Sequence, residues 1–166
     1  MGIETLPADV RAHIAAHREL YLRSGGAQGQ IRDARPSGAH YFGTSCLIRY
    51  KGRKSGRTMI TPLSYGAIGG EVVIVGSKGG SPDHPQWYLN IRDAGEIDFQ
   101  IATQAFRATL REPEGAEREK VWNFISDCYP FYLKYQARAP RIIPIVMMKA
   151  FEEIPVFKES DITPAA

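Results

Sequence analysis

The sequence predicts a single α+β domain built around a small β-barrel. The chain has 166 residues, of which 43% are hydrophobic and 23% charged, and these values are typical of one globular domain. Five short runs rich in β-forming residues follow one another at close spacing. Helical periodicity lies mainly on either side of these runs, so the order of elements is α+β and not a regular βαβ alternation.

The first expected element is a helix over residues 8–23. Its apolar positions fall loosely on one stripe and include Val10, Ile14 and Tyr21, and the Ser-Gly-Gly at residues 24–26 ends it. Because the helix is basic, it could touch a membrane surface, but packing on the domain is the simpler interpretation.

Residues 27–38 are rich in glycine and polar side chains and are expected to form a mobile connector. This pattern divides the chain into an N-terminal helix with its connector, residues 1–38, and a barrel domain, residues 39–166.

The expected strands lie at residues 44–50, 58–65, 71–75, 97–103 and 106–111. A short helical pattern around residues 85–92 interrupts them, and a longer one at 114–127 follows them. No GxGxxG motif is present, which disfavours a doubly wound nucleotide-binding fold. The apolar run at residues 142–148 fits either the core or an interface, such as that of a homodimer.

The net charge of +3 is too small to indicate a dedicated nucleic-acid-binding protein, and no nucleic-acid partner is expected. Residues 1–60 contain ten of the 21 Lys and Arg but only four of the 18 Asp and Glu, so the basic excess is local. Two cysteines and no signal sequence fit a reducing cytosol. We therefore expect a cytoplasmic protein, at most peripheral to the inner face of the membrane. The four histidines form no recognisable ligand set, so no metal site is expected.

The densest group of cations lies at residues 49–57, in the run RYKGRKSGR. It contains Arg49, Lys51, Arg53, Lys54 and Arg57 and no acid. Gly52 and Gly56 allow a tight turn, and its backbone amides together with Lys54 and Ser55 can donate to phosphate or carboxylate oxygens. The run is therefore a candidate anion site, while a solvated hairpin tip remains the alternative.

A second candidate segment, residues 75–90, leaves a strand through glycines and enters the short helix. Glycines let backbone amides approach a ligand closely, and Lys78 adds a positive charge. Trp87 and Tyr88 can form a flat wall for a conjugated ring. His84 precedes a proline and has no partner at a telling spacing, so we interpret it as a turn residue.

A third segment places Tyr129, Tyr132 and Tyr135 at a spacing of three, which brings them to one face of a helix. Phenols can line an apolar pocket and still donate a hydrogen bond. A core-facing aromatic stripe is the alternative. Pro130 disfavours α geometry at Tyr129, so the stripe is expected to break at its start.

Taken in order, these segments resemble the deazaflavin-dependent nitroreductase family, split β-barrel oxidoreductases of actinobacteria and some other bacteria. The matching fragments, spread over residues 44–145, are GRKSG (52–56), TPL (61–63), SKGG (77–80), HPQWYLN (84–90) and YPFYLKYQ (129–136). The resemblance implies an FMN-binding split-barrel-like fold, mainly antiparallel, with flanking helices. It also implies the 8-hydroxy-5-deazaflavin coenzyme F420 as cofactor.

The resemblance also implies roles for individual residues. The GRKSG loop would hold the phosphate and acidic oligoglutamate tail of the coenzyme, and the segments after it would lie beside the ring. The implied coenzyme-binding residues are Arg53, Lys54, Ser55, Gly56, Arg57, Thr61, Pro62, Ser77, Lys78, Gly79, Pro85, Trp87 and Tyr88. The implied catalytic residues, which would hydrogen-bond the acceptor, are Ser77, Tyr129, Tyr132 and Tyr135.

One position departs from the family pattern. The family usually has arginine where this chain has Met59, and that arginine helps to hold the anionic tail of the coenzyme. Arg57 lies two positions earlier, a shift that keeps the same face of a strand. Either Arg57 compensates for the missing arginine, or the affinity for the coenzyme is reduced.

The resemblance implies an oxidoreductase that transfers hydride from the reduced coenzyme to a quinone, a nitroaromatic compound or an activated enone. Because a split barrel does not fix function, a second hypothesis stays open. In it, the protein binds deazaflavin, flavin mononucleotide (FMN) or a tetrapyrrole without catalysis, with FMN the less expected cofactor.

Overall fold

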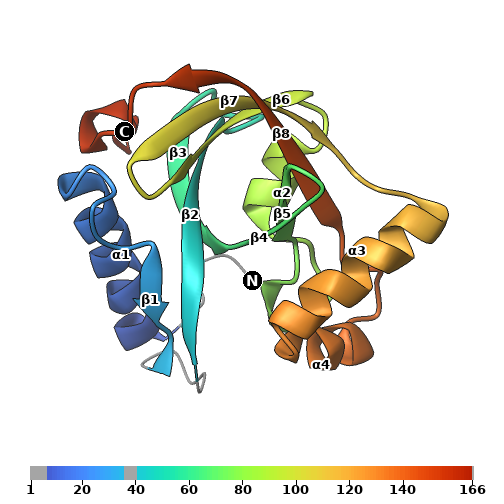
Figure 1. The fold of residues 1–166 in the computed structure, drawn as a ribbon. Coiled ribbons are helices and arrows are strands. Elements are labelled where there is room, and N and C mark those ends of the chain that lie inside the picture. The colour runs from blue at the N-terminus through green and yellow to red at the C-terminus, as the bar shows by residue number, and fades with distance from the viewer. Residues whose placement is uncertain (1–6, 36–40, 166) are drawn as a thin grey trace.

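The computed structural model describes residues 7–35 and 41–165. An antiparallel sheet of eight strands curls around the centre of the molecule, and helices cover its two sides (Figure 1). The strands are β1 (Ile31–Asp33), β2 (Phe42–Lys51), β3 (Thr58–Ser64), β4 (Gly66–Ile68), β5 (Glu71–Val75), β6 (Glu96–Ile101), β7 (Gln104–Arg111) and β8 (Ile145–Ile154). The helices are α1 (Ala8–Arg23), α2 (Gln86–Ile91), α3 (Gly115–Cys128) and α4 (Phe131–Arg138), with short 3₁₀ turns at η3 (Lys78–Gly80) and η4 (Glu159–Asp161).

The strand order is β1-β2-β6-β7-β8-β5-β4, and β3 pairs with β2. Helix α1 lies outside β1 and β2, whereas α3 and α4 lie on the opposite side of the molecule (Figure 1). The long strand β2 pairs with three strands, β1, β3 and β6, and so joins the side of the sheet near α1 to the rest of the barrel.

Side-chain alternation along β2 builds two separate cores. Cys46 and Ile48 point to the inside of the barrel, where they pack with Trp87 of α2. Leu47 points the other way and packs with Tyr21 of α1 and Phe157 of the C-terminal segment. A third core lies between the sheet and the pair α3 and α4. Both faces of the sheet are therefore covered.

This double coverage explains the apolar run at residues 142–148. In β8, Ile145 and Met147 pack toward α3 and α4, and Val146 and Met148 pack into the barrel. Both faces of a strand buried on two sides are apolar, so the run shows no alternation. Of the two interpretations, the core is correct for the buried residues from Ile143 onward, while the side chain of Ile142 is 73% exposed.

The expected mobile connector at residues 27–38 is wrong for residues 31–33. They form β1, whose Ile31 pairs with Thr44 of β2 in an antiparallel ladder. Ala34, directly after this strand, is buried. The domain boundary expected at residue 38 falls among residues 36–40, outside the described residues, and stays a prediction.

Helix α1 is fixed to the barrel through the fully buried Tyr21. The Tyr21 hydroxyl donates to the carbonyl oxygen of Ser45 at 3.1 Å and accepts from the amide of Ala102 at 2.8 Å. One side chain thus joins α1 to β2 and to the turn between β6 and β7. In the part of the chain that the structure describes, no helix is long and apolar enough to cross a membrane.

Candidate functional site

The hairpin loop at residues 52–56 joins β2 to β3 and contacts α2. The Gly52 amide donates to the carbonyl oxygen of Arg57 at 2.9 Å, which closes the loop. The Arg53 amide donates to Oδ1 of Asn90 at 3.0 Å, and its Nη1 donates to the same oxygen at 2.9 Å. Arg53 Nη1 also reaches Oε1 of Gln86 at 3.4 Å. Helix α2 therefore holds the basic loop in place.

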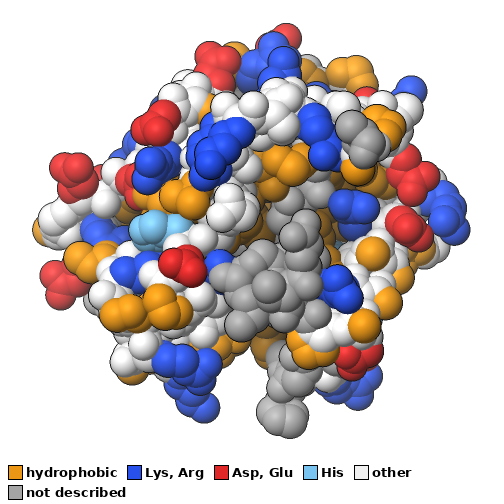
Figure 2. Space-filling view, turned by 180° about the vertical axis from the view of Figure 1, so that it is seen from behind, with side chains coloured by type: hydrophobic (Ala, Val, Ile, Leu, Met, Phe, Trp, Pro, Cys, Tyr) orange, Lys and Arg blue, Asp and Glu red, His pale blue; other side chains and the backbone are white. Residues whose placement is uncertain are grey.

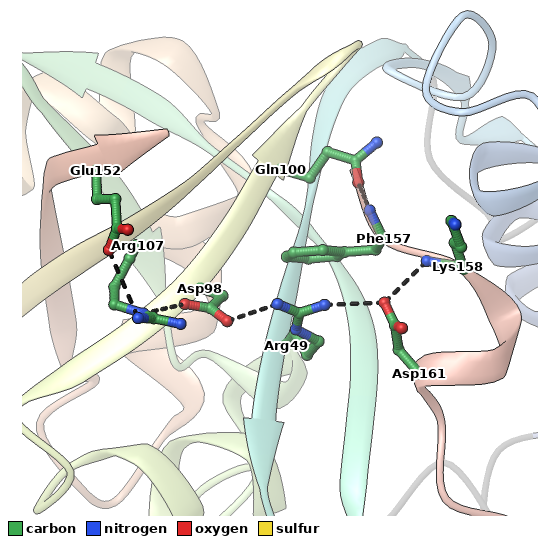
Figure 3. Close-up of polar contacts among 8 residues, drawn as sticks. All are labelled: Arg49, Asp98, Gln100, Arg107, Glu152, Phe157, Lys158 and Asp161. Carbon is green, nitrogen blue, oxygen red and sulfur yellow. Dashed lines mark hydrogen bonds and ion pairs between the residues drawn. The ribbon is translucent and has the colours of Figure 1, made fainter. Parts of the chain in front are cut away.

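Arg49 belongs to a different part of the molecule from the loop cations. Its guanidinium pairs with Asp98 of β6 and with Asp161 of η4, each at 2.8 Å, and lies 4.4 Å from the centre of the Phe157 ring (Figure 3). These two carboxylates neutralise it. Inclusion of Arg49 in the candidate anion site is therefore wrong.

No nearby carboxylate balances the charges of the loop cations Arg53 and Lys54 within the described residues, in contrast to Arg49. The partners of Arg53 are neutral amides, and the exposed Lys54 and Arg53 have no ion pair within the described residues. An uncompensated cation attracts an anionic ligand, whereas a neutralised one does not. More widely, Lys and Arg side chains are spread over the face seen from behind, with hydrophobic side chains between them (Figure 2).

The segment after β5 bends sharply beside α4. Lys78 has φ 45°, a left-handed conformation that is uncommon for a residue other than glycine. Gly80 has φ 80°, and a Cβ atom there would lie 2.6 Å from the carbonyl oxygen of Tyr135. This close contact of two backbones brings the segment at residues 77–80 against the tyrosines of α4.

Arg141 holds the same segment from the other side. Its guanidinium donates to the carbonyl oxygens of Gly76 at 3.2 Å, Ser77 at 3.0 Å and Ser81 at 3.0 Å. Nη1 also contacts Nδ1 of His84 at 3.0 Å. Burial lowers the pKa of Arg141, which nevertheless stays a cation because its usual value is so high. Its hydrogen-bond partners are neutral, and the nearby carboxylate of Asp83 opposes part of the lowering of its pKa.

A cavity of about 490 Å³ lies between these groups, on the flank of α2. Its lining residues are Lys78, Pro82, Asp83, His84, Gln86, Leu89 and Arg141. Gln86 also contacts Arg53, so the cavity and the basic loop share one helix.

His84 is a neutral hydrogen-bonding group in this cavity. Burial, followed by the positive charges of Arg141 and Arg92, lowers the pKa of His84 below its usual value. Since Arg141 can only donate, Nδ1 of His84 accepts and its proton is assigned to Nε2. The interpretation of His84 as a simple turn residue missed this pair, because Arg141 is 57 positions away in the sequence.

The two aromatic residues of α2 face the barrel core. The side chains of Trp87 and Tyr88 are 8% and 7% exposed, and Pro85 before them is also buried. The Tyr88 hydroxyl donates to the Glu112 carboxylate at 2.9 Å, and burial raises the pKa of Tyr88 to about 12. Contact of Pro85, Trp87 and Tyr88 with a coenzyme ring stays a prediction, and their visible contribution is to support α2.

Thr61 and Pro62 are neighbours in β3, so their side chains point to opposite faces. Thr61 lies opposite Ile48 and its hydroxyl is 2.8 Å from that of Tyr50, whereas Pro62 lies opposite Leu47. The two side chains therefore cannot line the same wall of a ligand site. Their roles in coenzyme binding stay predictions.

The three tyrosines lie in one aromatic cluster but differ in their hydroxyls. Tyr129 has φ −135° and ψ 83°, which confirms that the helical stripe breaks before Pro130. Its hydroxyl donates to the carbonyl oxygen of Tyr65 at 2.8 Å and is 2.8 Å from Oγ1 of Thr44. The only proton of this phenol is therefore already used within the protein.

Tyr132 and Tyr135 lie together on α4, with ring centres 6.3 Å apart. Their hydroxyls have no hydrogen-bond partner among residues 7–35 and 41–165, and neither has the side-chain hydroxyl of Ser77. Burial raises the pKa of Tyr132, so its phenol stays protonated at neutral pH. The backbone of Tyr135 lies against Gly80, whereas the rings of Tyr132 and Tyr135 pack in the core between the sheet and the helices α3 and α4.

The arrangement places cations and a cavity beside α2, where an anionic group can be attracted. Cations whose hydrogen-bond partners are neutral flank α2, and the aromatic cluster that contains Tyr132 and Tyr135 lies on the side of α4. Sequence reasoning missed Gln86, Asn90 and Arg141, which position the loops. No local signal marks these three residues, because their partners are remote in the sequence.

Comparison with known proteins agrees with this geometry. The model of the F420H(2)-dependent quinone reductase family matches residues 21–150, well over half of the chain. An F420H(2)-dependent quinone reductase of Mycobacterium tuberculosis (strain H37Rv) is 29% identical over 107 residues, which are 63% of this chain and 72% of that protein. A second, putative reductase of that name from the same strain is 27% identical over 103 residues, 62% of this chain and 87% of its own.

Solved structures support the same assignment. The F420-H2 dependent reductase FDR-A is 35% identical with a TM-score of 0.58, over 63% of this chain and 93% of its own. A protein described as a domain-swapped dimer is 30% identical with a TM-score of 0.61, over 82% and 96% of the two chains. A heme-binding protein of Mycobacterium smegmatis, 14% identical with a TM-score of 0.51 over 64% of this chain and 46% of its own, shares the fold alone.

These likenesses confirm the predicted α+β split-barrel class and the resemblance to deazaflavin-dependent reductases. The coverage by the family model also makes an oxidoreductase, and not a passive binder, the class of this protein. The chain belongs to the F420H(2)-dependent quinone reductase family.

Proposed function

We propose that this chain transfers hydride from the reduced deazaflavin coenzyme F420 to a quinone, and that nitroaromatic compounds and activated enones also serve as acceptors. The single observation that carries this assignment is the pairing of the basic loop, whose Arg53 and Lys54 have no acidic partner within the described residues, with free phenols on α4. A cationic loop suits the phosphate and glutamate tail of the coenzyme, and phenols suit an oxygen that gains negative charge.

The basic loop fits the anionic part of the coenzyme. Arg53 is oriented by Asn90 and keeps its charge, and Lys54 extends from the same turn. Ser55 and Gly56 add a hydroxyl and a backbone amide at the tip. Nε of Arg57 is buried without a hydrogen-bond partner in the described residues, which is unusual for a native donor. These residues would hold the phosphate and the tail.

The ring would lie beside Ser77, Lys78 and Gly79, where φ is positive at three successive residues, 78 to 80, in a turn of the kind that can present backbone amides to a ligand. When bound, the reduced deazaflavin supplies the hydride. Lys78 contributes positive charge at this end of the cavity. Because Arg141 fixes the carbonyl oxygens of Gly76 and Ser77, the segment does not have to reorganise when a ligand enters.

Tyr132, Tyr135 and Ser77 would donate hydrogen bonds to the acceptor oxygen. Each has a free hydroxyl, and the raised pKa of Tyr132 keeps its proton in place. Tyr129, one of the four residues expected to be catalytic, has a different assignment. Its hydroxyl is bound to Tyr65 and Thr44, so it positions α4 against β2 instead of donating to the acceptor.

Titration of the purified protein with F420, FMN and haem tests this proposal, followed by mixing of the reduced F420 complex with menadione. We expect tight binding of F420 and rapid oxidation of the bound coenzyme by the quinone. Binding without oxidation would instead favour the carrier hypothesis. Lys54→Glu should weaken binding of F420, whereas Lys149→Glu, a charge reversal on the exposed part of β8, should not.

We also propose that the enzyme works as a cytoplasmic homodimer. The related domain-swapped dimer and the exposed apolar side chains of Phe42 and Ile142 support this assembly. Peripheral membrane contact through α1 has weaker support, because Tyr21 and Leu22 of this helix are buried against the barrel. Light scattering measures the mass in solution, and liposome flotation measures the membrane contact.

A further inference from the structure

The C-terminal segment, residues 155–163, lies beyond the part of the chain that the family model matches, which ends at residue 150. It folds back over the outer face of β2 and β3. Phe157 is fully buried there, and its amide donates to Oε1 of the buried Gln100 at 2.7 Å (Figure 3). This part of the chain is therefore an integral layer of the fold.

Two anchors fix the segment before it reaches the basic loop. The ring of Phe157 packs under the guanidinium of Arg49, and Asp161 pairs with the same guanidinium at 2.8 Å. Asp161 also accepts from the amide of Lys158 at 2.9 Å, which closes the η4 turn. The path of the chain after residue 161 is therefore set by Arg49.

Beyond this turn, Thr163 pairs with the first residue of β3. Its amide donates to the carbonyl oxygen of Thr58, and its Oγ1 accepts from the amide of Thr58, both at 3.0 Å. Pro164 follows and favours an extended conformation at Thr163. The carbonyl oxygen of Thr163 then accepts from Nη2 of Arg57 at 3.1 Å.

Arg57 thus lies between the C-terminal segment and the basic loop. Its carbonyl oxygen accepts from the Gly52 amide, which closes the loop, and its own amide donates to Oγ of Ser55 at 3.3 Å. Its guanidinium is half-buried, and Nη2 donates to Thr163. Within the described residues the other guanidinium nitrogens have no hydrogen-bond partner, and Nε is buried. A guanidinium held through Nη2, whose Nη1 makes no hydrogen bond to the described residues, keeps a donor for an anion and is preorganised to bind it.

We propose that the C-terminal segment is a positioning device for Arg57, and that Thr163 sets this arginine to bind the anionic tail of the coenzyme. The inference rests on the proposed function, since it assumes that F420 binds at the basic loop. It would also explain how the chain does without an arginine at Met59. Thr163, which lies outside the family match, would hold Arg57 in place and so make up for the arginine that is absent at Met59.

The variant Thr163→Pro tests this inference because it removes both bonds to Thr58 and keeps the full chain. Ile162 has φ −74° and ψ 125°, a conformation that a following proline accepts. Thr163 is exposed, so the buried Phe157 and its core are left in place. Thr163→Ser keeps the amide and the hydroxyl and is the matched control.

The probes are F420 with its glutamate tail and the corresponding deazaflavin riboside without phosphate and tail. We expect Thr163→Pro to weaken binding of the tailed coenzyme about 5- to 10-fold, the effect of misplacing one charge-assisted donor. Binding of the tail-less riboside should stay unchanged, and Thr163→Ser should behave as wild type. In an Arg57→Gln background, Thr163→Pro should cause no further loss.

Two results would overturn the inference while the proposed function stands. One is an equal loss for both probes, and the other is a loss that persists in the Arg57→Gln background. Either would mean that the segment acts on the fold in general and not through Arg57. Failure of the wild-type protein to bind F420 at all would instead reject the proposed function, and the inference with it.

Discussion

Removal of the Arg49 charge should destabilise the protein strongly. In Arg49→Met the long apolar stem stays over Phe157, but Asp161 loses this cation and Asp98 keeps only its pair with Arg107, at 3.3 Å. The side chains concerned are 22%, 17% and 29% exposed, so the pairs lie between the surface and the interior. Exposed pairs contribute up to about 1 kcal/mol and breaking a buried one costs about 3–5 kcal/mol, so we expect a loss of about 2–3 kcal/mol.

The assay is thermal and urea unfolding followed by circular dichroism. For a chain of this size, the expected loss lowers Tm by about 4–12 °C. Arg35→Met is the matched control, because Arg35 also pairs with one carboxylate, Asp33, and lies 4.9 Å from an aromatic ring, that of Phe42. The pair of Arg35 and Asp33 is 62% and 35% exposed, and its loss should change Tm little.

If Arg49→Met and Arg35→Met lose the same stability, partial burial does not strengthen the Arg49 pairs and the expectation is wrong. A double-mutant cycle of Arg49→Met with Asp161→Asn separates the pairwise contribution from general disruption. Repeating the measurement at about 1 M salt adds a second check, because screening weakens exposed pairs more than buried ones.

Three further predictions concern the site and α1. Replacing Tyr132 and Tyr135 together by phenylalanine should lower kcat about 10- to 100-fold while Kd for F420 stays constant, and unchanged turnover of menadione would contradict the assigned donors. Gly80→Ala should cost about 2–3 kcal/mol in urea unfolding because of its φ of 80° and the nearby carbonyl oxygen of Tyr135, more than Gly79→Ala, which meets no neighbour. Burial lowers the pKa of His17, so its contribution to stability is fully present above about pH 6.5 and is lost as the pH decreases. His17→Gln should therefore make the unfolding free energy fall less steeply toward low pH. An unaltered pH dependence would show that His17 does not cause the decline.

The fold was largely readable from the sequence where one local pattern dominates. The helix at 8–23 and the strand at 71–75 form over the predicted residues, because each is bounded by glycines or by charged and polar residues. Strand β8 was not predicted as a strand, since its first half is buried on both faces and lacks alternation. Strand β1 was missed because three residues between glycine-rich stretches carry almost no signal until β2 pairs with them.

The site was predictable in its residue types but not in its contacts. Spacing identified the cations near Arg53 and the phenols of α4, because both lie in one segment of the chain. The groups that orient them come from elsewhere: Asn90 for Arg53, and Arg141 for the segment after Gly76. A single sequence does not show such long-range partners, so it also could not show which cations are neutralised.

Neutralisation is what separates the two halves of the basic run at residues 49–57. Arg49 lies inside β2, beside the strand and the turn that carry Asp98 and Asp161, so its charge is used to hold the sheet and the C-terminal segment together. Arg53 and Lys54 lie beyond the end of β2, where Arg53 bonds to side-chain amides of α2 and neither residue has an ion pair within the described residues. A side-chain amide orients a guanidinium without cancelling its charge. The loop therefore keeps a positive electrostatic potential, and the guanidinium of Arg53 is held in one position. The local basic excess of the sequence thus serves stability on the strand and, in the proposed function, ligand binding at the turn.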